Sequence, residues 1–208
     1  LKYLSESLHR GMLWDEAMDE WKNALRGLPN IALFGKMGSG KTTLAHALSS
    51  GLGYRRISIG KRIKSIAWQF FEDKMRIGKE TQRTTLQELN ESFMAIDPRV
   101  WVRMACQDLD NAGHPYVIDD ARHEADLTFL LSKGWNCFRL ICPEPVRLRR
   151  ILDRDEYTPP AQVLTHVSES QQDKVLSGAL EIQSDQEPTA LLSEIVSRLP
   201  AELKSFFQ

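Results

Sequence analysis

The sequence has few of the features that would place a protein in a membrane or outside the cell. Its 208 residues include three cysteines, at positions 106, 137 and 142, and these stand at no spacing typical of metal ligands. Three thiols cannot all pair within one chain, so we expect them to be reduced. No apolar run reaches the roughly 18 residues that a transmembrane helix needs, and no signal-peptide pattern is present. These absences predict a cytoplasmic protein without a membrane-spanning segment.

An excess of charge of either sign is also absent. The chain carries 27 basic and 28 acidic residues, a formal net charge of -1 at pH 7. Proteins that bind bulk nucleic acid or anionic membranes normally present a strongly basic surface, so we expect neither kind of partner. Hydrophobic residues make up 42% of the chain, enough to build the core of one domain of this length.

Residues 1–28 are predicted to form an N-terminal amphipathic helical extension. Apolar residues recur there at Trp14, Met18, Trp21 and Leu25, a spacing that puts them on one face of a helix. A helix of this kind most often packs against the domain that follows it. Its two tryptophans also make it a candidate interface for a homodimer.

From residue 29 to residue 208, short apolar strands alternate with amphipathic helices. The expected strands cover residues 31–34, 54–59, 115–120, 135–142 and 180–184, and the expected helices cover 43–52, 61–75, 84–93, 99–111, 126–133, 144–154 and 188–199. Strands that alternate with helices imply a parallel sheet covered by helices on both faces. The sequence therefore predicts an α/β protein of three layers.

A glycine-rich segment follows the first expected strand directly. From Gly35 to Thr42 it matches the phosphate-binding pattern GxxxxGK[ST]. Its glycines let backbone N–H groups approach phosphate oxygens, and the N-terminus of the next helix adds to the attraction. We predict that the ATP phosphates bind at Gly35, Met37, Gly38, Ser39, Gly40, Lys41, Thr42 and Thr43. Lys41 would bridge the β- and γ-phosphates as a catalytic group, and Thr42 would offer its hydroxyl to Mg²⁺.

Two aspartates, Asp119 and Asp120, stand at the carboxyl end of an expected strand, the edge at which open α/β sheets bind ligands. One of them can hold Mg²⁺ through water, or orient and deprotonate the attacking oxygen. We predict both as catalytic residues, with Asp119 on the magnesium side. The simpler alternative is an aspartate that caps a helix. Arg122 follows closely and could neutralise a substrate phosphate.

An arginine-rich helix is expected after the fourth strand, with arginines at 147, 149, 150 and 154. Arg150 and Arg154 lie one helical turn apart and share a face. Phosphoryl transfer needs cationic groups around the transferred phosphate, so we predict these two as catalytic residues of a lid at about residues 144–172. A solvated helix face is the alternative.

Taken in order, these motifs resemble the nucleoside monophosphate kinases of the P-loop class, and are most similar to the deoxynucleoside monophosphate kinases of bacteriophages. The resemblance covers about residues 30–199. It rests on the phosphate loop, Lys64 within Ser58–Lys64, Arg83, Leu86-Gln87, Asp97, Trp101, Asp119-Asp120-Ala121-Arg122, and the arginine segment before Ser168-Glu169-Ser170.

The resemblance implies a P-loop kinase fold with a helical acceptor-binding insert at about residues 61–111. It also implies phosphoryl transfer from ATP, with Mg²⁺, to a (deoxy)nucleoside 5′-monophosphate, in the host cytoplasm if the protein is phage-encoded. Small nucleotides would be its partners. It would place Arg83, Gln87 and Trp101 near the acceptor nucleotide, and Lys64 and Arg122 near the acceptor's phosphate.

The chain departs from the family pattern at Asn90-Glu91, where a glycine and then an arginine are usual, and at Ser184 and Gln186, where asparagine and glycine are expected. Three other functions stay open on the sequence. They are a kinase for another small metabolite, such as dephospho-coenzyme A, a kinase for a modified base or an end within a polynucleotide, and a nucleotide-dependent switch or motor ATPase. The Asn-Lys-x-Asp motif of GTPases is absent.

Overall fold

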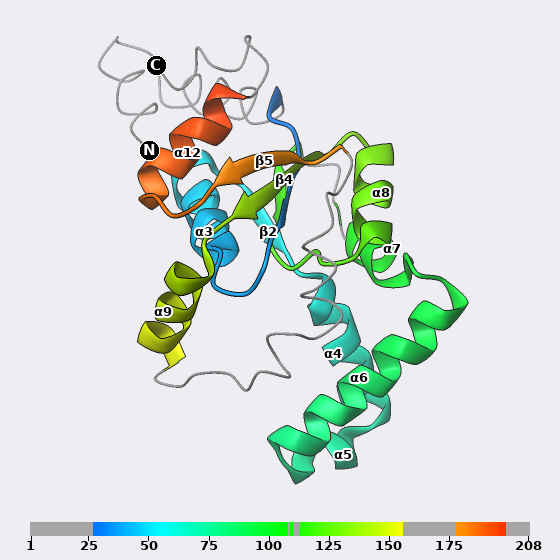
Figure 1. Cartoon of the computed structure of the whole chain (residues 1–208). Coiled ribbons are helices and arrows are strands. Elements are labelled where there is room, and N and C mark those ends of the chain that lie inside the picture. The colour runs from blue at the N-terminus through cyan, green and yellow to red at the C-terminus, as the bar shows by residue number, and fades with distance from the viewer. Residues whose placement is uncertain (1–26, 108, 110–112, 156–177, 199–208) are drawn as a thin grey trace, which may run out of the picture.

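The computed structural model describes residues 27–107, 109, 113–155 and 178–198, and within them five parallel strands form one sheet (Figure 1). The strand order is β2-β3-β1-β4-β5, so β1 lies at the centre. The strands are β1 (Ile31–Phe34), β2 (Arg55–Ile57), β3 (Tyr116–Ile118), β4 (Asn136–Ile141) and β5 (Leu180–Gln183). Because all pairs are parallel, the loops that leave the strands gather at one edge of the sheet.

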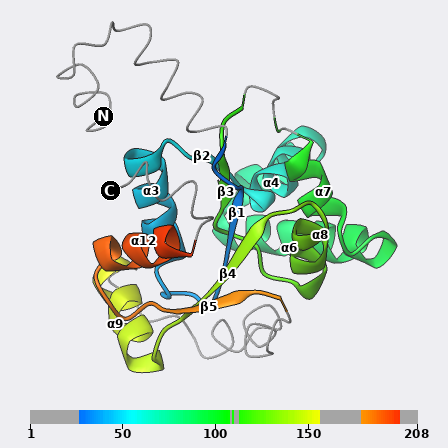
Figure 2. The ribbon, with the colours of Figure 1, turned by 90° about the horizontal axis from the view of Figure 1, so that it is seen from above.

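Helices cover both faces of this sheet. They are α3 (Lys41–Leu52), α4 (Ile59–Phe70), α5 (Glu72–Ile77), α6 (Lys79–Ile96), α7 (Val100–Cys106), α8 (Glu124–Ser132), α9 (Glu144–Asp155) and α12 (Pro188–Ser197). Figure 2 shows α3 and α12 on one side of the strands and α4, α7 and α8 on the other. This arrangement confirms the predicted α/β fold of three layers around a parallel sheet.

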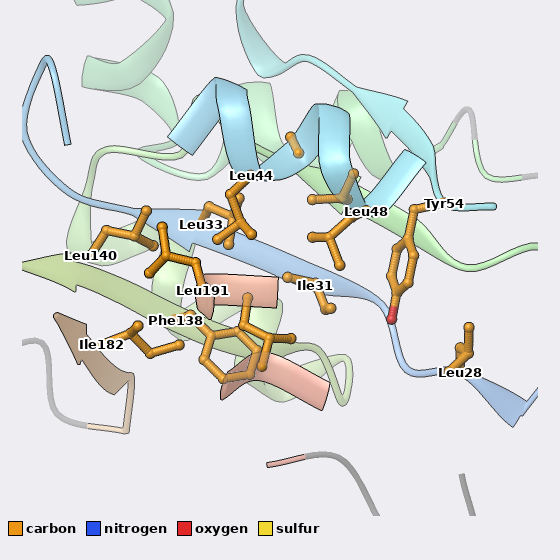
Figure 3. Packing of buried hydrophobic residues seen from close by; sticks show 13 residues of the cluster. Leu28, Ile31, Leu33, Leu44, Leu48, Tyr54, Phe138, Leu140, Ile182 and Leu191 are labelled. Atoms are coloured by element: carbon orange, nitrogen blue, oxygen red, sulfur yellow. The ribbon is translucent and has the colours of Figure 1, made fainter. Parts of the chain in front are cut away.

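The central strand β1 is apolar on both faces because both are covered. Ile31 and Leu33 pack beneath α3, where Figure 3 shows Leu44 and Leu48 lying over the strand. The alternate residues of the strand belong to the second core cluster, on the side of α7 and α8. All four strand residues are fully buried, so the glycine-rich loop starts from a rigid support.

The helices between β2 and β3 form the expected insert, but the predicted bounds of all three helices are wrong. The predicted helix 61–75 is two helices, α4 and α5, because the backbone leaves the helical region at Phe71 (φ -134°, ψ 35°). After the break α5 packs against α6, and Met75 on α5 is buried. The predicted helix 99–111 ends already at Cys106, and α6 is longer than predicted.

Some predictions fall outside the described residues. The N-terminal extension lies outside them up to residue 26, and the proposed lid does so from residue 156. Both stay predictions. In the described part of the chain, no helix is long and apolar enough to cross a bilayer.

Candidate active site

The glycine-rich segment forms a tight loop between β1 and α3. Gly35, Gly38 and Gly40 have φ values of 138°, 79° and 94°, which side-chain-bearing residues rarely adopt. A Cβ at Gly35 would lie 2.7 Å from the carbonyl oxygen of Leu140, and one at Gly38 would lie 2.6 Å from that of Arg147. The loop therefore needs glycine for its turn and because β4 and α9 pack directly against it.

Lys41 begins α3 and its side chain folds back into the loop. Its Nζ donates to the carbonyl oxygens of Gly35 and Lys36, the second at 3.0 Å. Thr42 and Thr43 follow in the exposed first turn of the helix. All eight predicted phosphate-binding residues thus lie in the loop or in this first turn. Backbone N–H groups at a helix N-terminus beside a lysine ammonium are suited to bind phosphate.

Arg147 of α9 supports the phosphate loop through a hydrogen bond. Its side chain is only 7% exposed, and its Nη1 donates to the carbonyl oxygen of Met37 at 3.0 Å. The sequence pattern places this arginine in the predicted lid segment, but it is not one of the predicted site residues. The sequence contains a signal for the inward direction of Arg147, because the apolar Ile151 follows one helical turn later on the same face. In the structure Ile151 is fully buried.

The two predicted lid arginines have different surroundings. Arg150 donates from Nη1 to the carbonyl oxygen of Ser184 at 2.8 Å and to Sγ of Cys142 at 3.6 Å, and this nitrogen lies 3.7 Å from where a Cβ of Gly40 would stand. Arg150 is therefore beside the phosphate loop. Arg154 lies on the exposed part of α9.

The neighbouring carboxylates Asp119 and Asp120 point to opposite faces of the sheet. Asp119 is 7% exposed and accepts a hydrogen bond on Oδ2 from Arg56 Nη2 at 2.8 Å. Asp120 accepts hydrogen bonds from Ser58 Oγ at 2.6 Å, Ile59 N at 2.9 Å and Gly60 N at 3.0 Å. Since successive side chains of an extended chain alternate in direction, one carboxylate faces α3 while the other holds the N-terminus of α4.

A third carboxylate, Asp126, lies near this edge and was not selected from the sequence. Its Oδ2 accepts hydrogen bonds from the backbone N–H of Arg122 at 3.1 Å and of His123 at 3.0 Å. Burial raises the pKa of Asp126, and the nearby charge of Asp120 adds to the rise, against the lowering effect of the two hydrogen bonds. The carboxyl group fixes the turn that carries Arg122.

A pocket of about 670 Å³ opens between the phosphate loop and the helical insert. All five residues predicted for the acceptor line it: Lys64, Arg83, Gln87, Trp101 and Arg122. Met37 of the phosphate loop, Asp120 and Asp126 line it too, whereas Asp119 is not among its lining residues. The structure therefore brings the predicted acceptor residues together around one cavity that reaches the loop.

Trp101 forms an aromatic wall of this pocket. Its ring stacks on Phe93 with 4.9 Å between centroids, and the residue is 3% exposed. Its indole Nε1–H is buried and has no hydrogen-bond partner among the described residues. A buried donor without a partner costs about 1–3 kcal/mol, so the site gains if a ligand supplies an acceptor.

Three further polar residues of α6 line the pocket: Lys79, Gln82 and Asn90. They share one helix face with Arg83 because residues three or four apart lie one above another. The sequence contained this spacing, but the predicted helix began at residue 84 and left the first two outside it. Asn90 is one of the departures from the bacteriophage pattern noted above.

A glycine-rich loop at the carboxyl edge of a parallel sheet, with a lysine at the start of the following helix, defines the P-loop class. A protein-family model described as an AAA domain matches residues 31–178. The chain therefore belongs to the AAA domain family. A comparison with curated proteins found no match.

Solved structures of low sequence identity share the fold. The tunicamycin resistance protein of Deinococcus radiodurans is 17% identical, with a TM-score of 0.54, over 82% of this chain and 94% of that one. A gluconokinase from Sinorhizobium meliloti 1021 is 16% identical, with a TM-score of 0.51, over 88% and 97%. Both matches extend over nearly the whole length of the solved chains. At this identity they show the fold alone.

Proposed function

We propose that the protein transfers the γ-phosphoryl group of ATP to a (deoxy)nucleoside 5′-monophosphate. The observation that carries this proposal is the pocket between the phosphate loop and the insert, which has basic side chains and an aromatic wall in one cavity. Lys64, Arg83 and Arg122 suit an acceptor phosphate, and Trp101, whose N–H has no partner among the described residues, suits a nucleobase. Met37 is common to the loop and the pocket wall, so donor and acceptor would meet there.

The donor side fits ATP with Mg²⁺. The hydroxyl of Thr42 and the carboxylate of Asp119 are oxygen ligands, the kind that Mg²⁺ prefers. When bound, the ion would supply positive charge that offsets the negative charge developing during transfer. In the proposed reaction Lys41 exchanges its two backbone partners for phosphate oxygens, and Arg150 approaches from the side of α9. Asp120 binds the N-terminus of α4 and so fixes the position of this helix, which carries Lys64.

An ADP-release assay with each ribo- and deoxyribonucleoside monophosphate tests the proposal. We expect one or a few of them to stimulate ATP turnover well above the rate with ATP alone, and Lys41→Ala to abolish this turnover. Gluconate belongs in the same panel, because one structural neighbour carries the name gluconokinase. If no nucleoside monophosphate stimulates turnover, the acceptor assignment is wrong.

A pair of arginine variants tests whether the acceptor binds in this pocket. Arg83→Gln should raise the KM for the acceptor by about tenfold or more and leave the KM for ATP unchanged, because it removes a charge from the pocket. Arg76→Gln is the matched control, since Arg76 is exposed on α5, pairs with Glu72 and is not a lining residue. Equal effects of the two changes would contradict the acceptor site.

A further inference from the structure

Arg56 connects two elements on the α3 side of the site. It lies on the edge strand β2, and its guanidinium donates from Nη2 to Asp119 Oδ2 at 2.8 Å and from Nη1 to His46 Nε2 at 2.9 Å. His46 is four residues after Thr42 on α3, so the two share a helix face. One guanidinium therefore joins the carboxylate at the end of β3 to the helix that follows the phosphate loop.

The two partners differ in exposure. Asp119 is 7% exposed, whereas Arg56 is 33% exposed. A carboxylate this far removed from water needs a fixed counter-charge, and a guanidinium supplies both the charge and a direction for the hydrogen bond. Arg56 contacts Oδ2, and Oδ1 accepts no hydrogen bond from the residues that the structure describes.

We propose that Arg56 is a positioning residue that orients Asp119 toward the magnesium ion of bound ATP. The inference rests on the proposed function, because it takes Thr42 and Asp119 as the magnesium-side groups. By binding Oδ2, Arg56 fixes the rotation of the carboxylate and leaves Oδ1 to accept a hydrogen bond from a water of the ion. His46 in turn limits the movement of the guanidinium.

The test is the ATP dissociation constant measured by calorimetry, once with Mg²⁺ and once with EDTA. The dissociation constant in EDTA divided by the constant with Mg²⁺ gives a ratio that isolates what the ion adds to binding through the protein. Residues that orient a metal ligand typically change metal affinity 10–100-fold, so we expect Arg56→Gln to lower this ratio by about tenfold and to leave the EDTA constant unchanged. Asp119→Asn should lower it similarly, and the double variant should lose nothing further.

Arg55→Gln is the matched control. It removes the same charge from the same strand, but its side chain points to the opposite face, so the ratio should stay at the wild-type value. Arg56→Lys keeps the charge without the guanidinium geometry and should give an intermediate ratio. If circular dichroism shows that Arg56→Gln does not fold, Arg56→Lys replaces it in the test.

Two results would overturn the proposal. One is a wild-type ratio in Arg56→Gln, or in Arg56→Lys if Arg56→Gln does not fold, while Asp119→Asn loses the magnesium effect. The other is a further loss in the double variant. Because no acceptor is added, a wrong acceptor assignment leaves this test intact, whereas wild-type protein that fails to bind ATP would overturn both proposals.

Discussion

Replacing Gly38 by alanine measures how tightly the phosphate loop is held against α9. A left-handed backbone costs a residue with a side chain about 1–2 kcal/mol, and Gly38 has a φ of 79°. Its new Cβ would lie 2.6 Å from the carbonyl oxygen of Arg147, so the loop must move away from the helix. That movement breaks the 3.0 Å hydrogen bond from Arg147 to Met37, and a bond from a charged donor contributes about 1.5–3 kcal/mol. We therefore expect the free energy of unfolding to fall by about 2.5–5 kcal/mol.

Gly134→Ala separates the two contributions. Gly134 has a φ of 76°, close to that of Gly38, but its Cβ would meet no described atom within 4 Å. This variant should lose about 1–2 kcal/mol, the backbone cost alone. Urea unfolding of both variants, followed by circular dichroism, gives the comparison, and ATP affinity should fall for Gly38→Ala only. Equal destabilisation by the two changes would refute the argued packing of the loop on α9.

Three more predictions follow from the site. Asp120→Ala should lower the free energy of unfolding by about 1–3 kcal/mol and raise the acceptor KM, because the N-terminus of α4 loses its carboxylate partner; an unchanged acceptor KM would contradict this role. Among the thiols, Cys142 should react first with a disulfide reagent at about pH 8, since burial raises the pKa of Cys137 to about 12 and that of Cys106 to about 11. Peptide mapping of the labelled protein would refute this order if Cys137 reacted first. Arg147→Met should keep the fold but weaken ATP binding, as measured by calorimetry, because Met37 loses its support; wild-type affinity would exclude that coupling.

The donor side of the site could be predicted from the sequence because its parts are neighbours in the chain. A buried strand, a glycine-rich turn and a helix that starts with Lys41 are all set by spacing within about 20 residues. The same holds for the layered α/β fold, which follows from the alternation of strands and helices. The helix break at Phe71 was missed because the apolar spacing continues across it, whereas the packing of α5 against α6 is a tertiary effect.

The sequence by itself determined that this chain has a phosphate loop, a parallel sheet around it, and aspartates and arginines at the edge where ligands bind. Only the tertiary structure decided the partners of those side chains. Arg147 meets Met37 across 110 positions, and Arg56 meets Asp119 across 63. Local spacing carries no information on such pairs, because strand order and helix packing bring them together. The same packing decided that Asp119 meets Arg56, whereas Asp120 meets the N-terminus of α4.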